Sequence, residues 1–403
     1  MKNCVLNQDI LHASLQVFLQ QLTEYEFTAG NAVAVGNEQG TILELYNGFA
    51  DLENAVPISE QTIYRMFSLT KPITALSTMQ LLEKGRISLD DPVSKYLSEY
   101  DNVRVWHDGR AKKAQNVMTL RMLLNMTSGL SYLEEDMEGL QKDLIWSWTR
   151  SNEEGHPWDT IRVAKELARI PLCFEPGTHF QYSLSLDVMG AVIEMVSGQN
   201  LGDYCEENIF RPLGMEETSW KLGEKNEHRL AKCYKHRDGK LICDDKHRAP
   251  VLNMMDLKNP VYYSGGAGVL STLSDYAKFA RMLLREGELD GRRIISADIL
   301  REMHSPQLKT RPLKEFKELL SRGQGIMHDF YNYGYGVRTM VKMPGKSKQI
   351  MGEWGWSGAM GTWLTVDPQS GIWFVYMHQG LPSNHMAYIP NLYHAIYSSF
   401  ERR

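Results

Sequence analysis

The N-terminal part of the chain alternates between a helical and a strand-like hydrophobic pattern. Apolar residues recur at helical spacing in the first segment, which predicts an amphipathic helix carrying Ile10, Leu11, Leu15, Phe18, Leu19 and Leu22 on one side. Two apolar runs within 31–51 are separated by a polar stretch ending in Gly40, which is the signal of a β-hairpin. A second helix is predicted from about Ser68 to Lys84, with a stop at Gly85.

The rest of the chain changes pattern twice. From about 86 to 260 it consists mostly of helical pieces broken by loops, with an exposed hairpin expected in 101–118. From about 265 a helix, capped by Asp or Ser, is followed by several strand signals, and the last segment again has helical spacing. This order predicts an α/β (α+β) fold in which both termini build one sheet domain, 1–85 and 261–403, and 86–260 forms an inserted helical domain. We expect the active site in the cleft between them.

Composition and charge narrow the classes of partner. The 403 residues are 43% apolar and 23% charged, as is usual for a globular protein, and the net charge is −5. A chain with a net negative charge has no positive electrostatic field to attract a nucleic acid or an anionic membrane, so neither is expected as a partner. The N-terminus lacks the continuous apolar core of a secretory signal, and no run is long enough for a membrane helix, so we expect a cytoplasmic protein.

One group of cysteines and histidines has nearly the spacing of a zinc site. Cys233-x-x-His236 is followed by Cys243-x-x-x-His247, and these are ligand types that tetrahedral zinc uses. The alternative is a surface hairpin turning at Asp238-Gly239, whose side chains never converge. The five cysteines of the chain are odd in number and widely scattered, so no disulfide framework is expected.

Ser68 and Lys71 carry candidate chemistry at the start of the second helix. Three residues apart on a helix, their side chains share one face, about 5–6 Å apart at Cβ. A serine hydroxyl is a poor nucleophile until a neighbour takes its proton, and a lysine can serve in place of histidine. Serine at a helix start is also an ordinary cap, and Ser-x-x-Lys alone is short enough to arise by chance.

Longer motifs along the chain, in the order found in one enzyme family, support a catalytic role for this pair. The stretch "MFSLTKPITALSTMQLLEKGRISLDDPVSKYL" resembles the nucleophile region of serine hydrolases related to class C β-lactamases, penicillin-binding proteins and family VIII carboxylesterases. The likeness continues at "LLNMTSGL" (123–130), "FEPGTHFQYSLSLDVMGAVIEMVSGQNLGDYCEENIFRPLGMEETSW" (174–220), "GGAGVLSTLSDYAKFARMLL" (265–284) and "GWSGAMGTWLTVDP" (355–368). It touches most of the chain from about 30 to 380. It implies the class C β-lactamase-like fold, with an antiparallel sheet flanked by helices.

The resemblance also implies roles for individual residues. Ser68 matches the acylated nucleophile, Lys71 the residue that accepts or relays its proton, and Tyr182 in "FQYSL" the second proton-transfer group. A phenol is ordinarily protonated at neutral pH, so Tyr182 would need the charge of Lys71 to act as a base. Without the resemblance, Tyr182 would be taken as a half-buried aromatic.

The third family motif falls at Trp356-Ser357-Gly358, on a strand expected to line the cleft. By comparison with the family, the oxyanion hole is the backbone N–H groups of Ser68 and Ala359. The glycine would let substrate approach the strand edge. The alternative for "EWGWSG" is a tight aromatic turn.

Two departures from the family pattern bear on the substrate. The usual Tyr-x-Asn is Tyr182-Ser183-Leu184, so the amide that would hydrogen-bond a peptide-like side chain is missing. The third motif carries Trp356 where most of the family has a lysine or histidine. Family VIII esterases resemble this chain in having a tryptophan at that position. We therefore expect Leu184, Trp356, Ser357 and Gly358 to contact a neutral, fairly apolar ester rather than a β-lactam.

These observations predict a serine hydrolase that cleaves small carboxylic esters, needing no metal or organic cofactor. Its partner would be a small-molecule ester or amide. Three alternatives stay open: acyl transfer with the same residues, β-lactamase or D-amino-acid peptidase activity, and an acyl-binding sensor that has lost turnover. The segment 304–334 is long enough to be a lid over the cleft.

Overall fold

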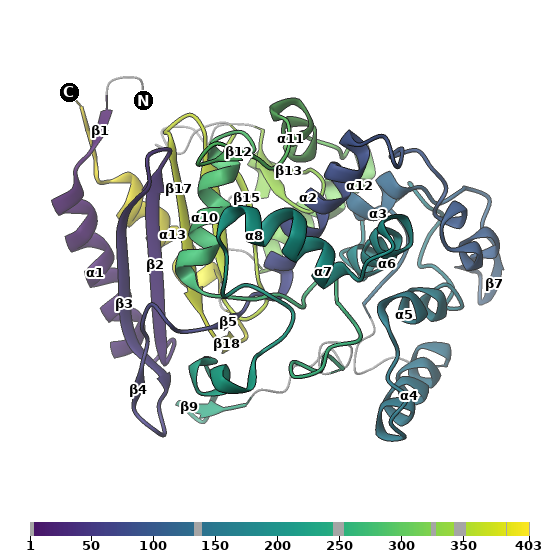
Figure 1. Ribbon diagram of the computed structural model, residues 1–403, viewed down its shortest axis with the longest axis horizontal. Coiled ribbons are helices and arrows are strands. Elements are labelled where there is room, and N and C mark those ends of the chain that lie inside the picture. The colour runs from purple at the N-terminus through teal and green to yellow at the C-terminus, as the bar shows by residue number, and fades with distance from the viewer. Residues whose placement is uncertain are drawn as a thin grey trace.

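An antiparallel sheet joins the two ends of the chain. The computed structural model describes residues 4–132, 139–244, 254–323, 328–341, 352–383 and 385–402. Within these residues eight strands form the main sheet, in the spatial order β13 (Tyr331–Tyr333), β14 (Arg338–Met340), β15 (Trp354–Ser357), β16 (Trp363–Asp367), β17 (Ile372–His378), β2 (Gly30–Asn37), β3 (Thr41–Asp51) and β4 (Val56–Pro57). The two ends meet in the middle of the sheet, where β17 pairs with β2 from Ile372↔Asn37 to His378↔Asn31 (Figure 1).

Helices cover both faces of this sheet, and the central strands β16, β17 and β2 are buried on both sides for that reason. Successive side chains of a strand point to opposite faces. On β2, Val33 and Val35 belong to the core under α1 (Gln8–Glu24) and α13 (His385–Tyr397), whereas Ala32 and Ala34 belong to the larger core on the other face. That second face is covered by α10 (Leu273–Leu284), with α2 (Thr70–Glu83) beyond it (Figure 1). The predicted mixed fold is therefore confirmed.

Helices are the main regular elements in the middle of the chain, and its described residues also contain two hairpins. The α-helices described there are α3 (Leu120–Leu124), α4 (Leu140–Glu153), α5 (Thr160–Leu167), α6 (Ser185–Ser197), α7 (Leu201–Cys205) and α8 (Arg211–Leu213). The hairpin expected in 101–118 is present as β6 (Arg104–His107) and β7 (Arg110–Lys113). A second hairpin, β8 (Tyr234–Arg237) with β9 (Lys240–Cys243), pairs with β18 (Gly380–Leu381) from the C-terminal part. The division into domains at 85/86 and 260/261 stays a prediction.

Short elements complete the fold. Three two-stranded pairs are β1 (Cys4–Leu6) with β19 (Phe400–Arg402), β5 (Tyr64–Arg65) with β10 (Leu270–Ser271), and β11 (Glu288–Leu289) with β12 (Arg292–Arg293). Two further helices, α11 (Ala297–His304) and α12 (Thr310–Gly323), precede β13. The prediction of a Ser or Asp cap for α10 is wrong: Thr272 is the cap, and its hydroxyl accepts the N–H of Asp275 at 3.3 Å.

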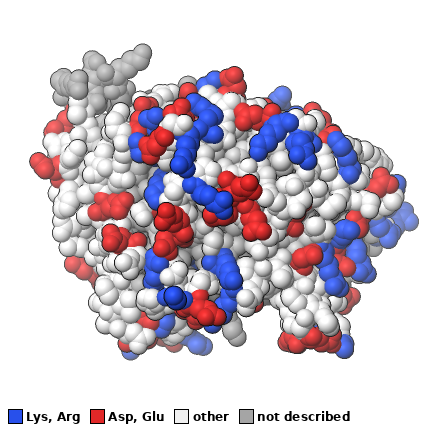
Figure 2. Space-filling model, in the orientation of Figure 1, with Lys and Arg blue, Asp and Glu red and all other residues white. Residues whose placement is uncertain are grey.

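The surface carries both signs of charge. Figure 2 shows Lys and Arg side chains interspersed with Asp and Glu over the face it displays, rather than one field of a single sign. Among the described helices, none combines the length and the apolar character needed to cross a membrane.

Candidate active site

A sharp turn delivers Ser68 from a strand to the start of a helix. Strand β5 ends at Arg65, and the 3₁₀ turn Phe67–Leu69 leads directly into α2. Phe67 has φ +44°, a left-handed conformation that is rare for a side chain of this size. Its ring is held in a small buried cluster with Cys233, Ala267 and Met360. Packing therefore enforces a strained backbone immediately before the predicted nucleophile, which is a recurring feature of functional sites.

The ammonium group of Lys71 is the hub of the site. Lys71 is completely buried, and its Nζ donates to Ser68 Oγ at 3.0 Å, to Tyr132 OH at 3.0 Å and to the carbonyl oxygen of Gly266 at 2.8 Å. Three acceptors match the three donors of a protonated lysine. Ser68 itself is 8% exposed, so its hydroxyl lies at the boundary between this buried hub and the surface.

Tyr182 lies beside the same ammonium group, in the loop before α6. The Lys71 Nζ is 4.6 Å from the centre of the Tyr182 ring, within cation–π range. The Tyr182 hydroxyl accepts a hydrogen bond of 2.9 Å from Nε1 of Trp356 on β15. The sequence motif that was expected to contact substrate thus also orients the tyrosine.

Tyr132 was not identified from the sequence. It follows the motif "LLNMTSGL" by two residues, and its hydroxyl bonds Lys71 while its ring lies 5.8 Å from that of Tyr182. Nothing in the local pattern distinguishes it from an ordinary partly buried tyrosine.

The turn after β15 is pressed against the backbone that precedes Ser68. Thr362 Oγ1 donates to the carbonyl of Met66 at 3.1 Å, and a Cβ at Gly358 would lie only 2.4 Å from the same oxygen. Gly358 is therefore needed for this close approach. Ala359 is partly buried beside the Phe67 cluster, at the tip of the turn. Its role in an oxyanion hole stays a prediction.

The predicted substrate contacts are more buried than expected. Leu184 is 2% exposed and belongs to the main core, and Trp356 is 1% exposed. Ser357, the last residue of β15, is 5% exposed, and Gly358 follows it. Their contact with a substrate remains a prediction, whereas the contact of Trp356 with Tyr182 is a feature of the structure.

The electrostatics of the site keep the lysine charged. Burial alone would lower the pKa of Lys71, but the acidic groups Tyr132, Tyr182 and Asp187 around it raise that pKa above its ordinary value. Burial raises the pKa of Tyr132 to about 12, although the Lys71 charge acts in the opposite direction. In the resting site Lys71 is therefore a cation and Tyr132 a neutral phenol.

Helix α12, within the predicted lid segment, packs over Trp356. The ring of Phe316 is completely buried, with its centre 5.3 Å from those of Phe180 and Tyr333 and 6.5 Å from that of Trp356. The neighbouring Glu315 accepts the N–H of Phe180 at 2.8 Å, two residues before Tyr182. This helix thus contacts the elements that hold the tyrosine, and whether it moves as a lid stays a prediction.

No metal centre emerges from the described part of the chain. There, no group of three or more His, Cys, Asp or Glu side chains is placed to hold a metal ion. Of the predicted zinc ligands, His247 lies outside the described residues. Cys233 is buried against Phe67, whereas His236 is exposed on the hairpin β8–β9.

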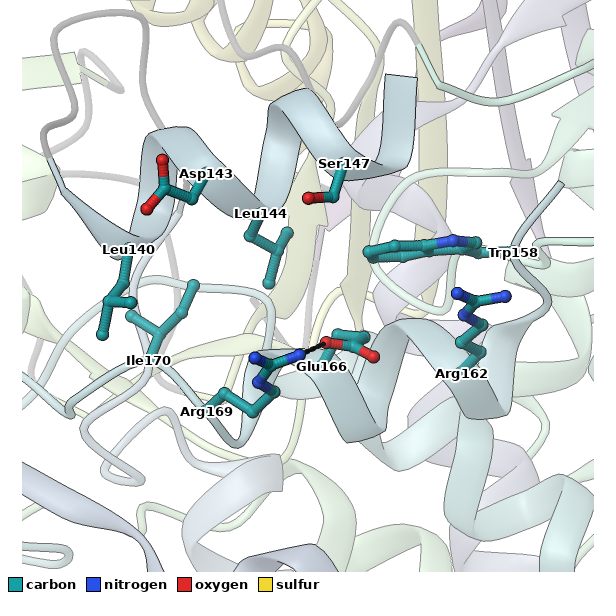
Figure 3. A pocket seen from close by; sticks show the side chains of 9 residues that line it. All are labelled: Leu140, Asp143, Leu144, Ser147, Trp158, Arg162, Glu166, Arg169 and Ile170. Carbon is teal, nitrogen blue, oxygen red and sulfur yellow. Dashed lines mark hydrogen bonds and ion pairs between the residues drawn. The ribbon is translucent and has the colours of Figure 1, made fainter. Parts of the chain in front are cut away.

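Two cavities of the structure lie away from these residues. One, of about 290 Å³, opens between α4 and α5; Figure 3 shows Leu144 and Ser147 of α4 opposite the ion pair of Arg169 with Glu166. A second, of about 270 Å³, is lined by Trp148, Trp158 and Tyr262, among others. Neither is lined by Ser68, Lys71 or Tyr182.

The fold and the family comparison define the class of the protein. An antiparallel sheet between helical layers, with a serine and a lysine at the start of a buried helix, is the architecture of the β-lactamase-related serine hydrolases. The family model for Beta-lactamase matches residues 18–397, and the chain therefore belongs to this family. Esterase EstB of Burkholderia gladioli is 32% identical over 271 residues, which are 64% of this chain and 66% of that enzyme. The protein is an enzyme of the serine hydrolase type.

Solved structures show the same fold over nearly the whole chain. EstCE1, described as a hydrolase with promiscuous acyltransferase activity, superposes with a TM-score of 0.78 at 23% identity and covers 97% of this chain and 99% of its own. Unliganded simvastatin synthase (LovD) from Aspergillus terreus gives a TM-score of 0.80 at 22% identity, over 96% of this chain and 98% of its own.

Proposed function

We propose that the protein hydrolyses small, neutral carboxylic esters through an acyl-enzyme on Ser68. The observation that carries this proposal is the buried Lys71 ammonium group, which bonds the Ser68 hydroxyl and the Tyr132 hydroxyl at 3.0 Å each. A lone pair of Ser68 Oγ receives the lysine N–H, so the serine proton is left for a base. The esterase name of the Burkholderia gladioli relative supports the same reaction class.

A tyrosine in its phenolate form, rather than Lys71, is the group that takes the serine proton, because a neutral phenol has no site for a further proton. Lys71 has no free lone pair while it donates three hydrogen bonds, but its charge stabilises a neighbouring phenolate. Tyr182 is the favoured base because its oxygen accepts the Trp356 N–H, which also stabilises a negative charge there. The same hydroxyl then returns the proton to the departing alcohol, and later activates the water that releases the acyl group.

The tetrahedral oxyanion is held by the backbone N–H groups of Ser68 and Ala359. Ser68 lies at the first turn leading into α2, where backbone N–H groups lack partners within the helix and the helix dipole is positive. The packing of Gly358 and Thr362 on the carbonyl of Met66, two residues before Ser68, supports the part proposed for Ala359 in the same turn. Donors fixed in this way are worth about 3–4 kcal/mol each to the transition state.

Neutral esters fit the site better than anionic β-lactams. The position of the third motif is occupied by Trp356, whose one polar hydrogen already bonds Tyr182, so it offers no cation to a substrate carboxylate. Leu184 replaces the amide that would bind a peptide-like group. A substrate carboxylate or amide buried here would lose its water contacts without gaining these partners, which costs free energy.

The test is covalent trapping followed by turnover. A p-nitrophenyl acetate to octanoate series should give a burst of p-nitrophenol, and a p-nitrophenyl phosphonate should leave one adduct on Ser68 by mass spectrometry. Ser68→Ala should lose both, with Ser77→Ala, a buried serine of the helix α2 that follows Ser68, as the matched control. Full esterase activity in Ser68→Ala would refute the proposal. Turnover of the β-lactam nitrocefin at a rate that rivals ester turnover would show instead that β-lactams are substrates of this site.

Acyl transfer is the second candidate, since it uses the same acyl-enzyme. EstCE1 is described as having acyltransferase activity as well as being a hydrolase, and a second alcohol could replace water beside Tyr182. Product analysis in the presence of a competing primary alcohol separates the two, because transfer gives a new ester at the expense of free acid.

A further inference from the structure

A single buried carboxylate faces the hub of the site from α6. Asp187 is 2% exposed, and its Oδ1 accepts three hydrogen bonds: from Tyr262 OH at 2.7 Å, from Ser264 Oγ at 2.6 Å and from the Gly266 N–H at 3.3 Å. An oxygen that only accepts, with three donors aimed at it, matches an ionised carboxylate. Its other oxygen, Oδ2, is buried and has no hydrogen-bond partner in the described structure.

The free oxygen points toward the lysine. A Cβ added at Gly266 would lie 2.7 Å from Asp187 Oδ2 and 3.3 Å from Lys71 Nζ, so the space beside this glycine separates the two groups. The carboxylate and the ammonium therefore lie within about 4–6 Å, the range over which opposite charges stabilise one another strongly. A peptide unit completes the link, because Gly266 gives its N–H to Asp187 and its carbonyl to Lys71.

We propose that Asp187 is a positioning residue for the reaction: its negative charge keeps Lys71 protonated, and its hydrogen bond to Gly266 fixes the carbonyl that aims the ammonium group at Ser68. This inference rests on the proposed acyl-enzyme mechanism. Burying a charge is costly unless an opposite charge compensates it, and Lys71 is completely buried. Asp187 supplies that compensation without bonding the lysine directly, which leaves all three lysine donors for Ser68, Tyr132 and Gly266.

The other groups around Lys71 cannot replace this charge. Burial keeps Tyr132, from the loop after α3, neutral, and Tyr182, from the loop before α6, loses its negative charge whenever it takes the serine proton. Tyr262 spends its hydroxyl on Asp187 itself. The remaining neighbours, Ser68 and Gly266, carry no charge. Asp187 is also the one carboxylate among the groups that raise the pKa of Lys71 in the described structure.

The substitution Asp187→Asn removes the negative charge while keeping the shape of the side chain, so it tests the role of the charge apart from that of the packing. The asparagine keeps an acceptor at Oδ1 for its three donors and replaces only the unpartnered oxygen. Removing the negative charge lowers the pKa of Lys71. In a plot of kcat/KM for a p-nitrophenyl ester against pH, the fall at high pH (the alkaline limb) should therefore lie about one pH unit or more lower in the variant than in the wild type. At neutral pH we expect a loss of about tenfold or more in kcat, with little change in KM, since the charge acts on the reacting serine.

Asp275→Asn is the matched control. Asp275 is 3% exposed, and its Oδ2 accepts the Glu217 N–H at 2.7 Å and the Thr218 hydroxyl at 3.1 Å, but it belongs to α10 and contacts none of the site residues. It should lower the melting temperature without moving the alkaline limb. If Asp187→Asn does not fold, Gly266→Ala serves instead, because its methyl group would stand between the carboxylate and the ammonium and should shift the limb in the same direction.

An activity-independent measurement distinguishes the two proposals. The Lys71 pKa can be followed through the ¹³Cε resonance of labelled lysine, assigned by its loss in Lys71→Met, whether or not an ester is turned over. A Lys71 pKa that is the same in wild type and in folded Asp187→Asn would overturn the role of Asp187. Absence of any ester turnover or Ser68 adduct in the wild type would overturn the proposed function while leaving the pKa difference intact.

Discussion

The indole N–H of Trp356 donates to the hydroxyl oxygen of Tyr182 across 2.9 Å, joining the third sequence motif to the proposed base. Both rings are held by neighbours: Trp356 packs edge-on against Tyr333 at 5.1 Å between ring centres, and Tyr182 lies over the Lys71 ammonium group. A phenolate formed at Tyr182 would therefore be flanked by a cation and by a fixed N–H donor. In the proposed mechanism Trp356 therefore acts through the tyrosine.

Replacing Trp356 by phenylalanine should lower kcat while the fold is kept. The smaller ring still packs against Tyr333 and Phe316, but the N–H that stabilises a charged Tyr182 is lost. A hydrogen bond to a charged group is worth about 1.5–3 kcal/mol, so we expect kcat/KM for a p-nitrophenyl ester to fall about tenfold or more. A change confined to KM would show instead that Trp356 serves only to bind substrate.

Tyr132→Phe and Tyr182→Phe should differ in severity. General base catalysis contributes about 10²–10⁴-fold, so the variant that removes the base should lose activity on this scale. We expect that loss in Tyr182→Phe, and a smaller one in Tyr132→Phe, because Tyr132 is held neutral by burial and serves to position Lys71. Measuring the acylation rate from the burst phase of both variants tests this order, and the reverse order would make Tyr132 the base.

Local sequence pattern was sufficient for the parts of the site that lie close together along the chain. The spacing of Ser68 and Lys71 predicts that their side chains meet, although Ser68 lies in the 3₁₀ turn before α2 and Lys71 in α2 itself. The strands β16 and β17 follow from their apolar runs. Buried strands in this sheet lack strict alternation, since helices cover both faces, and the mixed fold could still be predicted from the order of patterns. Resemblance to a family then added Tyr182 and the third motif.

The partners of Lys71 could not be predicted in this way, because tertiary packing brings them together. Tyr132 and Gly266 lie 61 and 195 residues from Lys71 along the chain, and hydrophobic periodicity indicates which face is buried but not what it meets. Asp187 is one of two acids in the apolar stretch "SLDVMGAVIEMV", the other being Glu194, and acids in such a stretch signal buried carboxylates that need partners elsewhere. The positive φ of Phe67 has no sequence signature at all.

Glu194 on α6 should make stability depend on pH. Burial raises the pKa of this carboxyl to about 7, although it accepts the Leu201 N–H at 3.0 Å. Since the folded pKa is above the ordinary value, the contribution to stability is complete below about pH 4.5 and is lost as pH rises toward 7. Glu194→Gln, which keeps the acceptor, should therefore raise the free energy of unfolding relative to wild type at pH 8 more than at pH 5, by up to about 3 kcal/mol. Urea unfolding at both pH values measures this, and Glu216→Gln, at an exposed position, should show no such difference.

A double-mutant cycle tests whether Lys71 and Asp187 compensate one another in the folded protein. Lys71→Met removes the buried cation but leaves the carboxylate, so it should lower the free energy of unfolding, as should Asp187→Asn alone. The combination should cost less than the sum of the two, with a coupling of about 1–3 kcal/mol, because the second change removes the charge that the first left uncompensated. Urea unfolding of the wild type and the three variants at pH 7 gives this coupling without reference to any substrate. The corresponding cycle with Asp275→Asn in place of Asp187→Asn should be additive, and additivity in both cycles would mean that the two charges do not interact.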